Sequence, residues 1–218
     1  MDGKAMKKAV IFDLDGVIVS TDEYHYRAWK ELANKHSIPF DRKINERLRG
    51  VSRMESLAIL LEKSERAYSL EEKIEMAEEK NDRYRDMLRE LTPEDILSGI
   101  PALLDELSSN DIKIAIGSSS KNTPYILKRI GLKNRFDAIA DGNHIKNSKP
   151  DPEVFLLAAN MLGVPPNECV VVEDAVAGID AAIAAGCKPV AVGYAADYPK
   201  AAYAVSEPSD LNIAELLK

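Results

Sequence analysis

The stretch AVIFDLDGV, residues 9–17, decides the fold that this sequence predicts. Its first four residues are apolar and rich in β-branched side chains, which is typical of a strand buried on both faces. Asp13 and Asp15 follow, and in extended backbone two side chains at this spacing point to the same side. Gly16 then lets the chain turn away from the sheet. Ligands of open parallel sheets bind at the carboxyl ends of the strands, so this pair is predicted to face a binding site.

Two such carboxylates fit more than one chemistry. One could accept a phosphoryl group as an aspartyl phosphate while its neighbour transfers a proton. Both could instead hold Mg²⁺, a hard cation that prefers oxygen ligands. A solvated turn after a strand is the alternative without function, and the Asp-x-Asp spacing alone favours it.

Composition narrows the class of protein. The chain has 218 residues, 45% hydrophobic and 30% charged, which indicates a globular protein with enough apolar material for a core. Its net charge of −7 argues against nucleic-acid binding. Cys169 and Cys187 have no metal-ligand spacing, which favours a reduced cytosolic protein. The N-terminal MDGKAMKKAV lacks the apolar core of a signal peptide, and no run is long enough to span a bilayer. We therefore expect a cytoplasmic protein without membrane contact.

The first half of the chain beyond the opening stretch reads as helical. Apolar residues recur at helical spacing after Tyr24, and further helices are predicted over 54–65 and 70–91. Ser69 and Glu72 have the spacing of a capping box at the start of the last one. A single parallel crossover uses one helix, so this long stretch predicts an inserted lobe. We predict a core of residues 1–20 and 93–218 and a helical cap of residues 21–92.

The second half alternates between strands and helices. Strands are predicted over 113–117, 137–140, 169–172 and 189–192. Helices are predicted over 102–107 and 122–130, with another capped by Asp151 with Pro152 in its first turn, and a last one ending near Gly186. This alternation predicts an α/β fold with a doubly wound parallel (Rossmann-like) sheet, into which the helical cap is inserted.

Polar residues of possible functional use stand at the ends of two of these strands and in one loop. The run Gly117-Ser118-Ser119-Ser120 stands where a strand passes to a helix and suits phosphate, although an ordinary helix cap is the alternative. Lys149 lies between Ser148 and Pro150 and could balance phosphoryl charge; alone it would be assigned to solvent. Glu173 and Asp174 end a buried strand. If that strand neighbours the first, four carboxylates converge and need a divalent cation or a raised pKa.

Four ordered motifs, FDLDGV, GSSS, SKPDP and VEDAVAG, resemble those of the haloacid dehalogenase superfamily. The resemblance implies that Asp13 is a nucleophile and Asp15 a general acid/base. It implies that Ser118 and Lys149 orient and neutralise the phosphoryl group. It also implies Mg²⁺ as cofactor, held by Asp13, the backbone carbonyl of Asp15, and Asp174, with Glu173 in or near that shell. Many members carry a helical cap where this chain has its helical stretch.

The cap stretches TDEYHYRAW (21–29), RGVSR (49–53) and KND (80–82), with SKN (120–122) in the core, resemble the β-phosphoglucomutase branch of this superfamily. This resemblance implies catalytic roles for Thr21, His25 and Lys80, and substrate contacts from Trp29, Gly50, Val51, Ser52, Arg53, Ser120, Lys121 and Asn122. Without it, Arg53 reads as a surface arginine beginning a helix, His25 as a partly buried helix residue, and Trp29 as part of the apolar interior of the cap.

Two positions depart from the branch. Arg49 stands in place of lysine, which keeps the charge but not its geometry, and Ser119 stands in place of alanine. Both bear on sugar preference and neither belongs to the catalytic set. His144 receives no role.

The resemblance implies interconversion of β-D-glucose 1-phosphate and D-glucose 6-phosphate through an aspartyl phosphate and β-D-glucose 1,6-bisphosphate. Hexose phosphates and hexose bisphosphate are the expected partners of a monomeric enzyme. A Mg²⁺-dependent sugar-phosphate phosphatase is the nearest alternative, and a phospho-acceptor or sugar-phosphate sensor without turnover is another. A dehalogenase is disfavoured because that chemistry has no need of Asp15.

Overall fold

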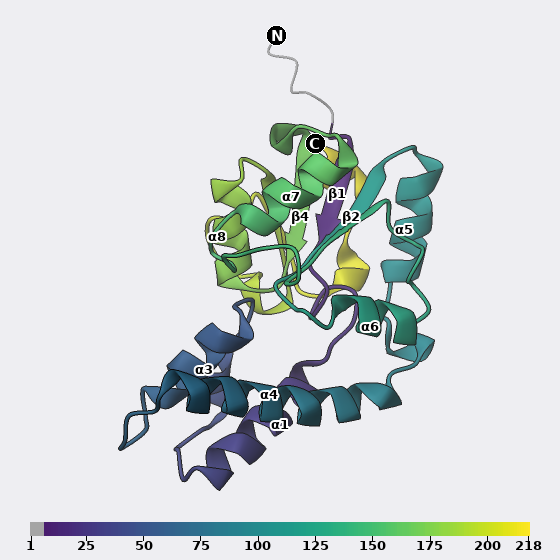
Figure 1. Ribbon diagram of the computed structural model, residues 1–218. Coiled ribbons are helices and arrows are strands. Elements are labelled where there is room, and N and C mark those ends of the chain that lie inside the picture. Colours follow the sequence, from purple (N-terminus) through teal and green to yellow (C-terminus); the bar gives the residue numbers. More distant parts are fainter. Residues whose placement is uncertain (1–6) are drawn as a thin grey trace.

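The computed structural model describes residues 7–218 and contains one sheet of six parallel strands. The strands are β1 (Ala9–Phe12), β2 (Lys113–Gly117), β3 (Ala138–Ala140), β4 (Cys169–Glu173), β5 (Lys188–Val192) and β6 (Tyr203–Val205). Their order is β3-β2-β1-β4-β5-β6, so β1 lies between β2 and β4 (Figure 1). The predicted doubly wound α/β fold is confirmed. Residues 1–6, part of the expected signal-free N-terminus and of the predicted core segment 1–20, lie outside the described residues.

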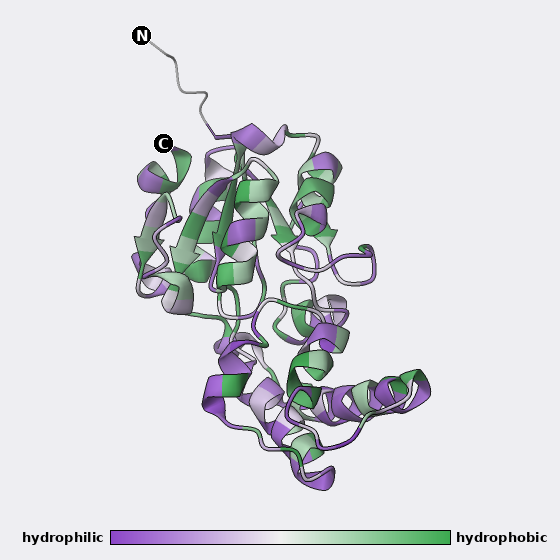
Figure 2. Cartoon of the chain, turned by 90° about the vertical axis from the view of Figure 1, so that its left-hand side faces the viewer, coloured by the Kyte–Doolittle hydropathy of each residue, from purple (hydrophilic) through white to green (hydrophobic). Residues whose placement is uncertain are grey.

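Both faces of the sheet are covered, because successive side chains of β1 point to opposite sides. Val10 and Phe12 belong to an apolar cluster with side chains of α5 (Ile100–Ser109), α6 (Thr123–Arg129) and α9 (Ile213–Leu217). Ala9 and Ile11 belong to a second cluster with α7 (Glu153–Leu162) and α8 (Val176–Ala184). Figure 2 shows the strands as an apolar layer between helices. This double burial explains the uninterrupted apolar run before Asp13.

A helical lobe lies at the carboxyl ends of the strands (Figure 1). It consists of α1 (Asp22–Lys35), α2 (Arg42–Glu46), α3 (Arg53–Leu61) and α4 (Leu70–Met87). These helices share an apolar cluster that includes Trp29, Leu57, Leu60 and Met76. We call this lobe the cap, and the limits 21–92 stay a prediction.

The cap helices test two details of the sequence analysis. The capping box is confirmed, since Ser69 Oγ accepts from the Glu72 amide at 3.2 Å and Glu72 Oε2 accepts from the Ser69 amide at 2.8 Å. The end predicted for the helix over 54–65 is wrong. Helix α3 ends at Leu61, directly after its last buried side chain, Leu60, because the polar residues that follow add no apolar contact.

Several short elements were not predicted, because three to five residues carry too little periodicity. They include α2, α9 and β6, and the 3-10 turns Pro93–Asp95, Pro166–Glu168, Gly193–Ala195 and Pro208–Asp210. The end predicted for the helix over 70–91 is wrong, because α4 ends at Met87 and the 3-10 turn Leu88–Glu90 follows it. Helix α7 begins at Glu153, so Pro152 precedes it instead of standing in its first turn. The predicted cap is wrong as well, because Pro152 is the N-cap residue. Asp151 lies one residue before it, and its Oδ1 accepts from the Glu153 amide at 2.9 Å.

The order of strands reverses beside β1, which is the point where open α/β sheets bind ligands. Asp13 follows β1, Ser118 follows β2, and Glu173 ends β4, so three neighbouring strands deliver polar groups to one place. Across residues 7–218, each helix is too short or too polar to cross a membrane.

Candidate active site

Three carboxylates meet where β1 and β4 end. The amide of Asp13 donates to the Val172 carbonyl at 2.9 Å, which continues the pairing of the two strands. One carboxylate oxygen from each of Asp13, Glu173 and Asp174 lies within 4.8 Å of the others. Burial and the neighbouring carboxylates raise the pKa of Glu173 to about 7 and raise that of Asp174 well above its ordinary value. Hard oxygen donors that resist ionisation together fit a divalent cation, so this set suits Mg²⁺.

Lys149 lies beneath this cluster. Its side chain is fully buried, and its Nζ donates to Asp13 Oδ1 at 2.6 Å and also to Glu173 Oε1. Burial alone would lower the pKa of Lys149, but the two carboxylates raise it above its ordinary value. The lysine is therefore held as a cation against the predicted nucleophile. Glu173 is fixed further by the Ala175 amide, which donates to its Oε2 at 3.0 Å.

Two glycines leave room for these carboxylates. A Cβ on Gly16 would lie 2.1 Å from Asp174 Oδ2, and its φ of +82° also disfavours a side chain. A Cβ on Gly178 would lie 2.0 Å from the Glu173 Cδ. The sequence analysis did not single out Gly178, although it stands in the VEDAVAG motif that carries Glu173 and Asp174.

The serine loop folds back on itself at the end of β2. Ser118 Oγ accepts from the Ser120 amide at 3.2 Å, and Ser120 Oγ accepts from the Asn122 amide at 3.2 Å. The N-cap residue of α6 is Asn122. The alternative that one of the three serines is an ordinary helix cap is therefore wrong. Ser118 is buried beside the carboxylates' end of the sheet, and Lys121 is exposed.

Asp15 is held in place by the start of the cap. Its carboxylate accepts from the Thr21 amide and from Thr21 Oγ1, both at 2.6 Å. Thr21 is buried, and its Oγ1 also lies 2.7 Å from Tyr84 Oη on α4. Burial and the nearby charge of Asp22 raise the pKa of Asp15 to about 7. A carboxyl group with this pKa can both give and take a proton near neutral pH.

His25 and Lys80 connect Asp15 to the interior of the cap. His25 Nε2 lies 3.7 Å from Asp15 Oδ2, and Lys80 Nζ lies 2.7 Å from His25 Nδ1. Burial and Arg53 lower the pKa of Lys80 well below its usual value. The Lys80 ammonium also faces the rings of Trp29 at 4.8 Å and Tyr84 at 4.6 Å. Trp29 is buried in the cap cluster, as its alternative reading expects, and it also lines the cavity; its contact with substrate stays a prediction.

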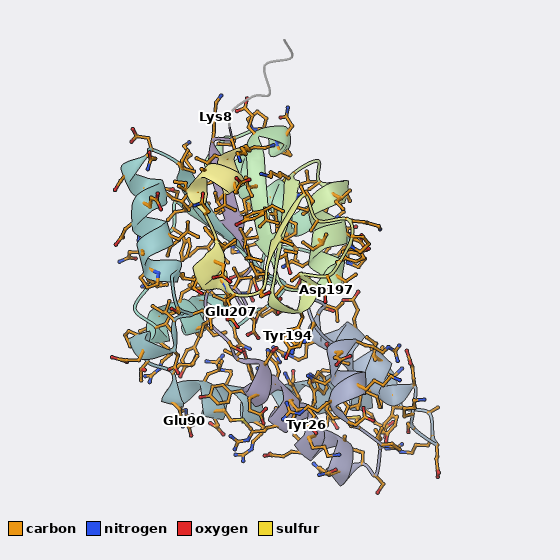
Figure 3. All side chains as sticks on the ribbon, turned by 180° about the vertical axis from the view of Figure 1, so that it is seen from behind. Lys8, Tyr26, Glu90, Tyr194, Asp197 and Glu207 are labelled. Carbon is orange, nitrogen blue, oxygen red and sulfur yellow. The ribbon has the colours of Figure 1, made fainter. Side chains whose placement is uncertain are left out.

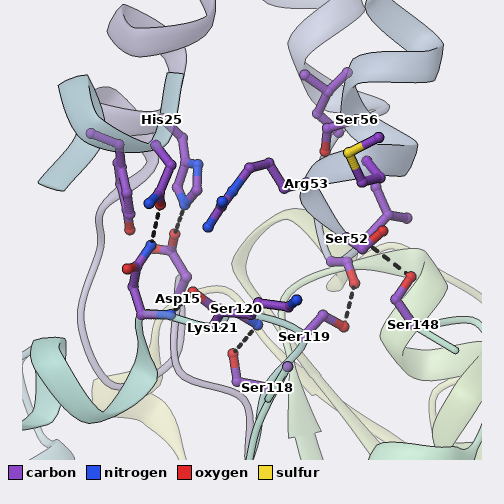
Figure 4. Close-up of a pocket in the computed structure, with 18 of the residues that line it drawn as sticks. Asp15, His25, Ser52, Arg53, Ser56, Ser118, Ser119, Ser120, Lys121 and Ser148 are labelled. Atoms are coloured by element: carbon purple, nitrogen blue, oxygen red, sulfur yellow. Dashed lines mark hydrogen bonds and ion pairs between the residues drawn. The ribbon is translucent and has the colours of Figure 1, made fainter. Parts of the chain in front are cut away.

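The predicted residues enclose a cavity of about 450 Å³ between cap and core. Arg53, the first residue of α3, projects into it from the cap (Figure 4). The predicted residues that line it are Asp13, Asp15, His25, Trp29, Gly50, Val51, Ser52, Arg53, Lys80, Ser118, Ser120, Lys121, Asn122 and Asp174. The remaining three, Thr21, Lys149 and Glu173, are buried and support Asp15 and Asp13 from behind.

Cap and core also touch through contacts that the sequence analysis did not predict. Asn122 Nδ2 donates to Asn81 Oδ1 at 2.8 Å, and Ser119 Oγ donates to the Gly50 carbonyl at 3.1 Å. Ser119, one of the departures from the expected branch, therefore contacts the cap loop.

The sequence analysis missed Tyr84, whose hydroxyl contacts Thr21. Its helical spacing could have indicated it, because it stands one helical turn after Lys80 on α4.

Arg49, the other departure, bridges the two bodies. Its Nη1 pairs with Asp22 of the cap and lies 3.4 Å from Asp174 Oδ2 of the core. Its guanidinium carbon lies 3.5 Å from the ring centre of Tyr194, which Figure 3 shows at the junction of core and cap. The planar fork makes this stacking possible, whereas a lysine ammonium would not stack.

Comparisons with known proteins agree with this architecture. Residues 7–186 match the model of the haloacid dehalogenase-like hydrolase family. The chain is 48% identical over 212 residues to a β-phosphoglucomutase of Bacillus subtilis, covering 96% of this chain and 93% of that protein. It is 35% identical to a phosphorylated carbohydrates phosphatase of Thermotoga maritima, covering 84% and 83%.

The fold comparison points the same way. A crystal structure of a β-phosphoglucomutase from Clostridium difficile superposes with a TM-score of 0.91 at 47% identity, covering 96% of this chain and 95% of that one. The resemblance inferred from the four motifs is thereby confirmed. The chain belongs to the haloacid dehalogenase-like hydrolase family.

Proposed function

We propose that this protein is a β-phosphoglucomutase, which interconverts β-D-glucose 1-phosphate and D-glucose 6-phosphate through β-D-glucose 1,6-bisphosphate. One observation carries the proposal: the carboxyl group of Asp15 reaches a pKa of about 7 and is connected through His25 to Lys80 of the cap. Proton transfer by Asp15 would thus be linked, through His25 and Lys80, to the cap, which also carries Arg53. The 48% identity to the Bacillus enzyme supports the mutase over the phosphatase, whose relatives are more distant.

In the first half-reaction, Asp13 carries the phosphoryl group. The 6-hydroxyl of bound β-glucose 1-phosphate attacks phosphorus, the bond to the Asp13 oxygen breaks, and Asp15 takes the hydroxyl proton. Lys149, which contacts Asp13 Oδ1 at 2.6 Å, balances the charge on the phosphoryl oxygens and on the released carboxylate. The products are free Asp13 and the bisphosphate.

In the second half-reaction, the bisphosphate turns end for end. Asp13 attacks the phosphorus on C1, and Asp15 returns its proton to the departing C1 oxygen, so glucose 6-phosphate leaves and phospho-Asp13 is restored. Arg53 suits the phosphate that is not being transferred, because its fork grips two oxygens at once. Ser120, Lys121 and Asn122 would complete that phosphate site, with Gly50, Val51 and Ser52 shaping the sugar pocket.

Mg²⁺ is the cofactor that we propose for this reaction. Asp13, Asp174 and the backbone carbonyl of Asp15 would hold it, with Glu173 beside them. When bound, the ion would supply charge neutralisation for the phosphoryl oxygens. We further propose a monomeric cytoplasmic enzyme. For the compartment, the supporting observation is that both cysteines are free thiols, which fits a reducing environment.

A product assay tests this proposal. Purified protein receives Mg²⁺, β-glucose 1-phosphate and a trace of β-glucose 1,6-bisphosphate, and both glucose 6-phosphate and inorganic phosphate are measured. A mutase forms glucose 6-phosphate without matching phosphate. Phosphate released in equal amount to the substrate consumed would replace it with a phosphatase. A stable phosphoprotein without turnover would indicate a sensor.

A further inference from the structure

A contact between the first turn of α3 and the loop that carries Lys149 has no part in the chemistry described above. Ser148 lies in the core loop between β3 and α7 and is buried. Its Oγ accepts from the Ser52 amide of the cap at 3.2 Å and donates to Glu55 Oε2 (Figure 4 shows the first of these bonds). A side chain of the core thus sits inside the capping arrangement of a cap helix.

On the cap side, this contact acts on a well-defined unit. Ser52 and Glu55 form a capping box: Glu55 Oε2 accepts from the Ser52 amide at 2.9 Å, and Ser52 Oγ accepts from the Glu55 amide at 3.3 Å. Arg53 stands between them in the same turn. The position of Arg53 in the cavity and the contact of Glu55 with the core are therefore fixed together.

On the core side, the loop that carries Ser148 also carries Lys149, which contacts Asp13. Ser148 immediately precedes Lys149, whose Nζ binds Asp13 at 2.6 Å. The loop is tied internally as well, since the Ser148 carbonyl accepts from the Asp151 amide at 3.0 Å. The amide of Asn147 donates to Glu153 at 2.8 Å. A loop held in this way moves as a unit, so a displacement of Ser148 displaces Lys149.

We propose that Glu55 and Ser148 are positioning residues that couple the seating of the cap to the placement of Lys149 against Asp13. This inference rests on the proposed function and deepens it. Arg53 engages the distal phosphate, the first turn of α3 settles against the core, and the Glu55–Ser148 bond then holds the cap in place while phospho-Asp13 exists. Loss of the bond lets Lys149 shift relative to Asp13, which slows transfer, and admits water more often, so hydrolysis of phospho-Asp13 gains on transfer to the sugar.

The chain offers a matched control. Ser69 and Glu72 form the same capping box at the start of α4, but the further partner of Glu72 is Arg66 of the cap, at 2.9 Å. Glu72→Ala therefore removes a capping box of the cap without touching the core. Ser148→Ala does the reverse, because it removes the contact with the core and leaves the Ser52–Glu55 box in place. Glu55→Gln keeps an acceptor oxygen and the box geometry.

The test measures the ratio of phosphate released to glucose 6-phosphate formed. Ser148→Ala and Glu55→Ala are expected to raise this ratio and to lower kcat/KM, each by roughly fivefold, because Glu55 is exposed and water competes for the lost bond. The double variant should be no worse than Glu55→Ala, which already removes the bond that Ser148→Ala removes, in addition to the capping box. Glu55→Gln should stay near the wild type, and Glu72→Ala should lower the melting temperature without moving the ratio.

An unchanged ratio in Ser148→Ala would overturn the inference, as would an equal rise in Glu72→Ala. Amide exchange of α3 gives a readout that does not need turnover, and Ser148→Ala is expected to speed it. If the wild type itself releases phosphate in equal amount to substrate, the proposed function fails. Faster exchange in Ser148→Ala would then still support the coupling, and unchanged exchange would refute that as well.

Discussion

Lys80 Nζ lies 2.7 Å from His25 Nδ1, inside a cap whose burial disfavours the charge on both groups. When Lys80 is an ammonium it can only donate, so Nδ1 then accepts and the ring proton stands on Nε2, 3.7 Å from Asp15 Oδ2. In that state Lys80 selects the tautomer that presents a donor to Asp15, the proposed general acid/base. The buried Lys80 cation lowers the free energy of unfolding of the protein, because a buried charge without a carboxylate contact is unfavourable.

Lys80→Met tests that trade. We expect the free energy of unfolding to rise by about 1 kcal/mol, since the replacement removes a buried charge while keeping most of the volume. Turnover should fall by about tenfold, because His25 is free to take the other tautomer and presents no donor to Asp15. Urea denaturation and the mutase assay measure the two effects. A variant that is less stable than the wild type would contradict this account of Lys80.

Asp13→Asn tests the nucleophile. The amide cannot form the aspartyl phosphate, so activity should fall by at least about 10³-fold. Lys149 keeps its contact with Glu173, and the fold should survive. Product formation is measured beside circular dichroism, which controls for unfolding. A folded variant that retains near-normal turnover would remove Asp13 from the mechanism.

Mg²⁺ should stabilise the protein, and more so at pH 8 than at pH 5. Asp15 and Glu173 ionise near pH 7 when folded, mainly because they are buried, whereas the unfolded chain ionises near its ordinary values of 3.8 and 4.5. Between these pH values the folded state binds more protons, so the free energy of unfolding of the metal-free protein falls as pH rises toward 7. The cation would lie beside the deprotonated Glu173 carboxylate and offset the part of that loss that comes from Glu173.

Thermal melts with and without Mg²⁺ measure this difference. At a hundredfold excess over its dissociation constant, an ion adds about 2.7 kcal/mol, or about 5–10 °C for a chain of this size. Ca²⁺ and a monovalent salt of equal ionic strength serve as controls. Equal stabilisation at both pH values would show that proton release is not linked to the ion.

Gly178→Ala should weaken this cation site. The added methyl group would meet the Glu173 carboxylate, and relieving that overlap should cost about 2 kcal/mol of stability. Glu173 would also shift relative to Asp174, so the affinity for Mg²⁺ should drop. Gly163→Ala is the control, because a Cβ there has nothing within 4 Å although its φ is +66°. Equal loss of Mg²⁺ affinity in both variants would rule out the steric explanation.

Arg53→Ala should raise KM for β-glucose 1-phosphate by about 10- to 100-fold, the loss expected when charge-assisted bonds to a phosphate are removed. Arg53→Lys keeps the charge but loses the fork and should recover only part of the affinity. Steady-state kinetics measures both. A KM that does not change in Arg53→Ala would place the distal phosphate elsewhere in the cavity.

The core of the site could be predicted because its logic is local. An apolar run that ends in carboxylates predicts both a buried strand and the position of those carboxylates at its end. Parallel strands bring such ends together at one edge of the sheet. Asp13, Glu173 and Asp174 are gathered in this way. Ser69 and Glu72 were equally readable, since a capping box needs only four consecutive positions.

The contacts between cap and core could not be predicted in the same way. Glu55 and Ser148 are 93 positions apart, and Arg49 reaches Asp174 across 125. Such pairs depend on how two bodies pack, and no periodicity in the sequence encodes that orientation. Arg49 was noticed as a departure, but its stacking on Tyr194 follows only from the arrangement of cap and core.

The cap has an apolar cluster of its own, built around Trp29 and Leu60, apart from the two that flank the sheet. Substitutions in the cap can therefore change the surface proposed to contact the sugar while the strands that carry Asp13 keep their own packing. A lineage inherits its phosphorus chemistry intact while new preferences for substrates arise above it.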